Sequence, residues 1–192
     1  KSTGELIKSN PNISAKDLDR INRIERATKQ STELTETLLL LAREERKESH
    51  GLERTQPGLI IRNIVAGFEP TLKLKPVKTK ITENDWLQVK APESVVSVVL
   101  SNLIGNAIKY TTEGTVHITL NKNSIVVEDD GIGVTESELP KLFDRHYRAG
   151  KANSKGSGLG LAIVKRLCDL YNWDIEIKRN NTTGLTATLT FN

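Results

Sequence analysis

The sequence predicts an α+β fold, in which a long helix precedes a two-layer sandwich of helices packed on one sheet. Three observations support this prediction. Apolar residues recur at steps of three and four from residue 18 to residue 41, which is the spacing of one helix face. The same period returns at residues 59–68, 94–110 and 159–171. Between these later segments lie short apolar or alternating runs of strand length.

The first helix is expected to begin at Ser14, because Ser14 and Asp17 are spaced as an N-cap pair. It should continue for about thirty-five residues, or roughly 50 Å. His50 then interacts with its last carbonyls, and Gly51 ends it. A helix this long cannot cover its own apolar stripe, so we expect partner helices, with a single amphipathic helix lying on the next domain as the alternative. A short hinge, residues 51–58, follows.

The sandwich is predicted to occupy residues 52–192. Three helices, at the segments with helical period, can cover one face of the sheet. The central helix, residues 94–110, has an apolar face suited to this packing, made of Val96, Leu100, Leu103, Ile104 and Ala107. Strands are expected at residues 78–82, 87–90, 115–120, 124–129, 174–178 and 185–191, with His117 facing away from its neighbours Val116 and Ile118.

Composition restricts the class of function. The apolar fraction of 36% and the few aromatic residues indicate an aliphatic core of one medium domain with an appendage. The net charge is +4, but no concentrated basic face emerges, so nucleic-acid binding is unsupported. Cys168 lies on the apolar side of a helix and should be buried, in a reducing compartment. No apolar run of membrane-spanning length and no signal peptide occur, so any membrane anchor is expected upstream of Lys1.

Asn102, Asn106 and Lys109 are the first candidate site residues, because spacings of four and three place them on one face of a helix. A neutral carboxamide oxygen is a suitable ligand for Mg²⁺ that nucleotide phosphates already hold. Lys109 would meet phosphate as a point charge. Taken alone, the two asparagines are better explained as the solvated face of an amphipathic helix.

Asp129 ends a short apolar run and is followed by Gly131 and Gly133. A carboxylate at the end of a strand can accept a hydrogen bond from an exocyclic amine, such as that of adenine. The two glycines allow the main chain to pass close to a flat ring. The alternative is an ordinary Asp-Gly turn after a strand.

Gly156, Gly158 and Gly160 precede a helix, with Leu159 between the last two. Glycines at a helix N-terminus present unpaired amides and the positive end of the helix dipole to an anion. No Gly-Lys-Ser/Thr closes the segment, so it is not a Walker loop. A flexible hinge is the alternative for this segment alone. Together, and in this order, the three segments predict a site for a magnesium nucleotide.

These residues resemble those of the sensor histidine kinases and their wider family, which includes gyrase, one class of heat-shock chaperones and the mismatch-repair ATPases. The resemblance covers residues 58–192 and implies a Bergerat-type ATP-binding fold. Residues 102–111 resemble the N box, 129–133 the first glycine box, 142–148 the F box and 156–160 the second glycine box. His146 departs from the aromatic residue that many kinases carry in the F box.

The resemblance implies a role for each matching residue. Asn106 is the Mg²⁺ ligand with Asn102 in support, and Asn106 and Lys109 are the catalytic residues. Asp129 binds the adenine amine, and residues 144–157 form the ATP lid. ATP and Mg²⁺ are therefore the expected cofactors. The implied nucleotide-binding residues are Asn102, Asn106, Lys109, Tyr110, Asp129, Gly131, Gly133, Arg148, Gly156, Gly158, Leu159 and Gly160.

The resemblance also bears on the reaction. The ATP-hydrolysing members carry Glu where this chain has Asn102, and a carboxamide cannot accept a proton from water at neutral pH. A histidine protein kinase is therefore expected rather than an ATPase. A purely ATP-binding interaction module and a serine kinase of the anti-sigma type are the alternatives. The long N-terminal helix disfavours the serine kinase.

By the same resemblance, residues 1–51 are the remnant of a dimerisation hairpin, comprising the end of its first helix and the whole second helix. The acceptor motif His-Glu/Asp-x-x-x-Pro does not occur at His50, His117 or His146. We therefore expect a fragment that begins after the acceptor histidine and is inactive in autophosphorylation alone. The expected partners are a second copy in the full-length parent and a cognate response regulator. We expect no nucleic acid, a cytoplasmic location, and membrane contact only through upstream segments.

Overall fold

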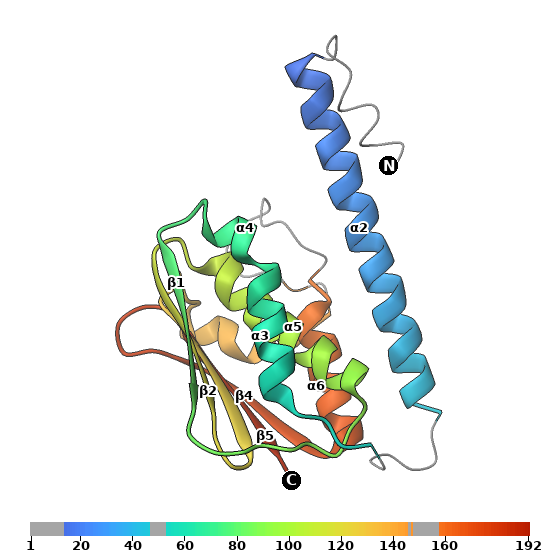
Figure 1. Ribbon diagram of the computed structural model, residues 1–192, viewed down its shortest axis with the longest axis vertical. Coiled ribbons are helices and arrows are strands. Elements are labelled where there is room, and N and C mark those ends of the chain that lie inside the picture. The colour runs from blue at the N-terminus through green and yellow to red at the C-terminus, as the bar shows by residue number, and fades with distance from the viewer. Residues whose placement is uncertain (1–13, 47–52, 146, 148–157) are drawn as a thin grey trace. The chain divides into compact units, whose positions relative to one another are not determined.

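The structure, a computed structural model, describes residues 14–46, 53–145, 147 and 158–192 (Figure 1). The chain divides into two compact units, with the boundary between Arg43 and Glu44. Among the described residues, no helix has both the length and the apolar character that crossing a membrane requires.

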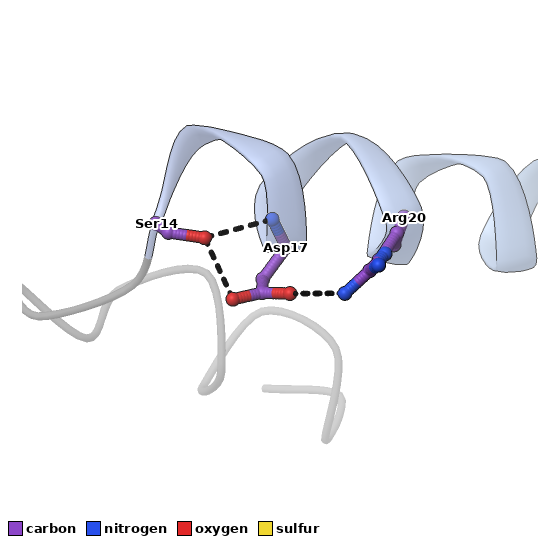
Figure 2. A network of polar contacts seen from close by, with 3 residues as sticks. All are labelled: Ser14, Asp17 and Arg20. Atoms are coloured by element: carbon purple, nitrogen blue, oxygen red, sulfur yellow. Dashed lines mark hydrogen bonds and ion pairs between the residues drawn. The ribbon is translucent and has the colours of Figure 1, made fainter.

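The first unit is built on helix α2 (Ala15–Glu44). The Ser14 hydroxyl accepts a hydrogen bond from the Asp17 backbone N–H at 3.1 Å and donates one to the Asp17 carboxylate at 2.6 Å. Arg20 pairs with the other oxygen of that carboxylate at 3.0 Å (Figure 2). The predicted N-cap pair is therefore confirmed. Large apolar side chains remain exposed along α2, namely Ile24, Leu38 and Leu39.

Helix α2 is shorter than the predicted length of about thirty-five residues. It has 30 residues and ends at Glu44. Glu44 and Glu45 belong to the second unit, where the hydroxyl of Tyr171 donates to the Glu44 carboxylate and Arg166 pairs with Glu45 at 2.8 Å. The helix therefore ends three residues after its apolar period, where Glu44 and Glu45 make these tertiary contacts. The predicted cap at residues 50 and 51 lies outside the described residues.

The second unit contains one five-stranded sheet, in the order β1-β2-β3-β5-β4. Strands β1 and β2 are parallel, joined by a crossover through helix α5 (Glu93–Tyr110), and all other neighbours are antiparallel. The observed bounds agree with five of the predicted strands to within one residue: β1 (Val77–Glu83), β2 (Gly114–Leu120), β3 (Ser124–Asp129), β4 (Trp173–Arg179) and β5 (Leu185–Phe191).

The predicted strand at residues 87–90 is wrong. Val89 and Thr55 exchange two backbone hydrogen bonds, but they form an isolated bridge. The pairing stops there because the Ala91 N–H turns back to the Val89 carbonyl, at 3.1 Å, and Pro92 has no N–H to extend a ladder.

Helices α3 (Pro57–Gly67), α5 (Glu93–Tyr110) and α6 (Gly160–Tyr171) gather on one side of the sheet (Figure 1). The five apolar residues predicted to pack on the sheet from α5 are all buried, as are the inward side chains of β2 and β3. The two-layer α+β sandwich is therefore confirmed. Two short elements that contain proline were not predicted, α4 (Glu69–Leu72) and the 3-10 helix η1 (Glu136–Lys141).

Two single-residue predictions are also confirmed. Cys168 is fully buried, and this burial raises the pKa of its thiol to about 12. His117 lies on the sheet face opposite the buried Val116 and Ile118, where its Nε2 is 2.9 Å from the hydroxyl of Thr82.

Candidate functional site

The two asparagines of α5 differ in their surroundings. Asn102 is half-buried, and its Nδ2 donates to the Val98 carbonyl at 2.8 Å. Its Oδ1 lies so close to Gly160, the first residue of α6, that a β-carbon built on Gly160 would overlap it. Asn106, one turn further along, is half-buried, and its side chain has no hydrogen-bond partner within the described part of the chain. The structure therefore brings the first and third predicted segments together.

Lys109 and Tyr110 lie at the exposed end of α5 and contact each other. The Lys109 ammonium donates to the Tyr110 hydroxyl at 3.1 Å and lies 4.7 Å from the centre of its ring. Tyr110 is itself 38% exposed. A cation held beside an aromatic ring at the surface is accessible to an incoming anion.

Asp129, the last residue of β3, is only 8% exposed. Its Oδ1 accepts hydrogen bonds from the backbone N–H groups of Gly131 at 2.9 Å and Leu185 at 3.4 Å. Burial raises the pKa of this carboxyl above its usual value, and the two backbone hydrogen bonds offset part of that effect. Oδ2 has no partner among the described residues, so a buried carboxylate oxygen remains able to accept a hydrogen bond from a ligand.

Gly131 is required by close packing between the second segment and the end of α5. A β-carbon on Gly131 would lie 2.6 Å from Asp129 Oδ1 and 2.8 Å from the Tyr110 carbonyl oxygen. The next residue, Ile132, donates its N–H to that same carbonyl at 3.3 Å. Gly133 has a positive φ of 61°. The turn after Asp129 therefore packs directly against the end of α5.

Two residues that support Asp129 were missed by the sequence analysis, Asn180 and Gly184 of the β4–β5 turn. Asn180 donates from Nδ2 to the Asp129 carbonyl at 2.9 Å, and its Oδ1 accepts from the Thr186 hydroxyl at 2.6 Å. Gly184 has a φ of 85°, and a β-carbon there would overlap the Asp129 carbonyl oxygen. The sequence around residue 184 indicates a turn but contains no signal that this turn packs on Asp129.

The third segment is described only from residue 158. Gly158 has a positive φ of 69°, Leu159 is the N-cap residue of α6, and Gly160 begins the helix. Among the described residues, no side chain forms a cap hydrogen bond at this helix start. Such a start presents backbone donors and the positive end of the helix dipole. Gly156, Arg148 and His146 lie outside the described residues, as does most of the predicted lid.

Tyr147 belongs to the predicted F box, and its hydroxyl donates to Glu138 at 3.2 Å. Glu138 also accepts the Thr135 backbone N–H at 2.8 Å, which closes a capping box at the start of η1. These hydrogen bonds lower the pKa of the Glu138 carboxyl. The F box is therefore anchored to the segment that follows the first glycine box.

The donor set fits a magnesium ion held chiefly by phosphates. The residues that the structure describes contain no group of three or more His, Cys, Asp or Glu side chains able to hold a metal. The half-buried carboxamides of Asn102 and Asn106 provide neutral oxygen ligands, and Mg²⁺ usually takes only one or two protein ligands beside phosphates and water.

A cavity of about 420 Å³ lies elsewhere, lined by the aromatic residues Tyr171, Trp173 and Phe191 together with the loop at residues 87–90. It contains none of the predicted nucleotide-binding residues. The buried Asp129 oxygen, which lacks a partner among the described residues, and the start of α6 therefore identify the candidate site better than cavity size does.

Residues 92–192 match the family described as histidine kinase-, DNA gyrase B-, and HSP90-like ATPase. The matched segment contains every residue predicted to bind nucleotide. Two relatives come from Bacillus subtilis (strain 168). The sensor histidine kinase YkoH is 34% identical over 116 residues, which cover 57% of this chain and 26% of YkoH. The sensor histidine kinase WalK is 38% identical over 114 residues, which cover 54% of this chain and 19% of WalK.

A solved structure shares the fold. The Acinetobacter baumannii histidine kinase AdeS matches with a TM-score of 0.68 at 19% identity, over 97% of this chain and 88% of that chain. The chain spans about a quarter or less of the length of the two curated relatives.

Proposed function

Because this chain belongs to the family of histidine kinase-, DNA gyrase B- and HSP90-like ATPases and contains the ATP-binding catalytic region of a sensor histidine kinase, we propose that it phosphorylates a histidine. The γ-phosphoryl group of bound ATP passes to an imidazole nitrogen on a dimerisation helix outside this chain. The products are ADP and phosphohistidine. The protein contributes charge neutralisation and positioning, which supply most of the catalysis in phosphoryl transfer.

Asn102 is the residue that favours transfer over hydrolysis. Its carboxamide lies against the start of α6, where the phosphates are proposed to bind, and its Nδ2 is engaged by the Val98 carbonyl. A carboxamide in this place cannot take a proton from water at neutral pH. The site therefore suits an external acceptor better than water.

Each group at the site has a proposed task. Asp129 Oδ2 accepts from the adenine amine, and the turn containing Gly131 allows the ring to approach the main chain. The start of α6 and Lys109 hold the phosphates. Asn106, with Asn102, holds Mg²⁺, which when bound neutralises charge on the phosphates.

The domain assignment, the partners and the location are also proposals. Residues 1–51 are a remnant of the dimerisation hairpin, and residues 52–192 are the catalytic domain. Exposed apolar side chains at Ile24, Leu38 and Leu39 support a second copy of the helix as a partner. We propose that the phosphoryl group then passes to an aspartate of a response regulator, inside the cytoplasm, where ATP and such a regulator are available.

Transfer in trans tests the function. The chain is incubated with γ-labelled ATP and Mg²⁺, alone and with acceptor-bearing dimerisation domains from its sensor-kinase relatives. We expect a label only on the added domain, labile in acid and stable in base. ATP that binds but transfers to none of these domains would favour the non-catalytic interaction module. An acid-stable label on serine would favour the serine kinase, and an acid-labile label on His50, His117 or His146 would contradict the acceptor assignment.

A further inference from the structure

Lys75 lies between α4 and β1, outside all four sequence boxes, and its side chain caps the C-terminus of α5. The Nζ of Lys75 donates to the carbonyl oxygens of Ile108 at 3.1 Å, Lys109 at 3.2 Å and Thr111 at 3.2 Å. The last carbonyls of a helix have no partner within the helix. Lys75 is half-buried, so these three bonds form at a site that is partly shielded from water.

Every carbonyl from residue 107 to residue 111 then has a partner. The Ala107 carbonyl accepts from both the backbone N–H and the hydroxyl of Thr111, at 3.0 and 2.7 Å. The Tyr110 carbonyl accepts from Ile132 of the first glycine box. Lys75 donates to the remaining three carbonyls, those of Ile108, Lys109 and Thr111. The end of α5 is therefore held by one cation and by the turn that follows Asp129.

We propose that Lys75 is a positioning residue for nucleotide binding, which orients Lys109 and Tyr110 toward the phosphates. This inference rests on the proposed function, because it takes Lys109 as the phosphate contact. Lys75 fixes the backbone turn from which both side chains extend. Its charge also offsets the negative end of the α5 dipole, which would otherwise oppose an anion bound beside Lys109.

The chemistry of the ammonium group suits this task. An ammonium carries three N–H donors around one nitrogen, and three carbonyls converge on it here. An arginine keeps the charge but spreads its donors over a planar fork, so it cannot direct three of them at the same point. Lys75→Arg should therefore restore only part of the function that Lys75→Met removes.

The test compares ATP with adenosine, because adenosine occupies the base site without phosphates. Calorimetry should show that Lys75→Met weakens binding of Mg²⁺-ATP by about tenfold, the loss expected for one misplaced phosphate contact, while adenosine binding changes less than about twofold. The ATP affinity of Lys75→Arg should lie between that of the unmodified chain and that of Lys75→Met. Lys73→Met is the matched control, since Lys73 is exposed and lies two residues away; it should leave both affinities unchanged.

A double-mutant cycle separates positioning from general loosening of the fold. If Lys75 acts mainly through Lys109, Lys75→Met should weaken ATP binding much less in the Lys109→Met background than in the unmodified chain. Additive losses, equal losses for ATP and adenosine, or an unchanged ATP affinity in Lys75→Met would each overturn the inference. If the unmodified chain bound no ATP, the proposed function itself would fail, which is a distinct result.

Discussion

The side-chain oxygen Oδ1 of Asn102, on α5, lies directly against the backbone of Gly160 at the start of α6. Gly160 contributes no side chain to this contact, so the Asn102 carboxamide meets the backbone of α6. The contact places a carboxamide from the first sequence box beside the backbone donors of the third, although 58 positions separate the two residues in the numbering. Any group added at residue 160 must therefore displace part of the proposed phosphate site.

Gly160→Ala tests this contact. Alanine is favoured over glycine within a helix, so we expect the domain to stay folded. The new methyl group would push the Asn102 carboxamide away, and binding of Mg²⁺-ATP should weaken by roughly tenfold or more. Gly67→Ala is the control, because a β-carbon at residue 67 meets no atom within 4 Å. Equal ATP affinity for the two variants, measured by calorimetry, would exclude Gly160 from the phosphate site.

Asp129→Asn should change base selection. The carboxylate offers only acceptors to the adenine amine, whereas an amide also presents donors, which suit the carbonyl that guanine has at that edge. ATP binding should weaken by roughly tenfold or more, since a hydrogen bond to a charged group contributes about 1.5–3 kcal/mol. The preference for ATP over GTP should fall with it. A chain that bound ATP and GTP equally before mutation would contradict the role of Asp129.

The raised pKa of Asp129 predicts a pH dependence. Because the folded-state pKa lies above the usual 3.8, the carboxylate becomes protonated at a higher pH than an exposed aspartate does. Adenosine binding should therefore weaken as pH falls through the raised pKa, and Asp129→Asn should remove this acid limb. The stability contribution has the opposite sign: it is fully present below the usual pKa and is lost as pH rises through the raised one. Denaturant titrations of the unmodified chain and of Asp129→Asn, at pH values from below 3.8 to above the raised pKa, measure this contribution to stability.

Gly184→Ala should destabilise the domain through the backbone. Residue 184 has a φ of 85°, which an L side chain rarely adopts, and the added methyl group would overlap the Asp129 carbonyl oxygen. We expect the free energy of unfolding to fall by about 2 kcal/mol or more. Asn180→Ala removes a hydrogen bond to the same carbonyl without this strain, so its loss should be smaller. Denaturant unfolding that ranked the two variants in the reverse order would contradict this account.

The elements that could be predicted were those decided by local pattern. The buried face of α5 repeats at helical spacing, and the Ser14–Asp17 cap lies within one turn. The run at residues 87–90 also has a strand pattern, but whether it forms a strand depends on a partner, and Thr55 provides only one bridge. Local pattern contains no information about that partner.

The supporting residues of the site could not be predicted for the same reason. Asn180 meets Asp129 across 51 positions, because β3 pairs with β5. Lys75 meets the end of α5 across 33 to 36 positions. A lysine in a stretch rich in lysine and an asparagine in a polar turn have no distinguishing sequence pattern. Their roles become visible only when the tertiary fold brings them to the boxes.

Asn106 is the proposed magnesium ligand, and its surroundings make that role testable. Its side chain is half-buried and has no hydrogen-bond partner in the described portion of the chain, so Asn106→Ala should break no hydrogen bond there. We expect the midpoint of thermal unfolding to stay nearly unchanged. ATP affinity should lose most of its dependence on Mg²⁺ concentration, because the oxygen that joins the ion to the protein is gone.

Asn106→Asp separates the ligand role from simple loss of a side chain. It keeps an oxygen donor but adds a negative charge beside the phosphates, so ATP should bind more weakly when Mg²⁺ is absent and recover part of the loss when Mg²⁺ is added. Asn123→Asp adds the same charge at an exposed position that lines the separate 420 Å³ cavity, and it should leave both titrations unchanged. If Asn106→Ala and the unmodified chain responded equally to Mg²⁺ in calorimetric ATP titrations, the ion would have to be held by other groups, and Asn106 would have no part in the site.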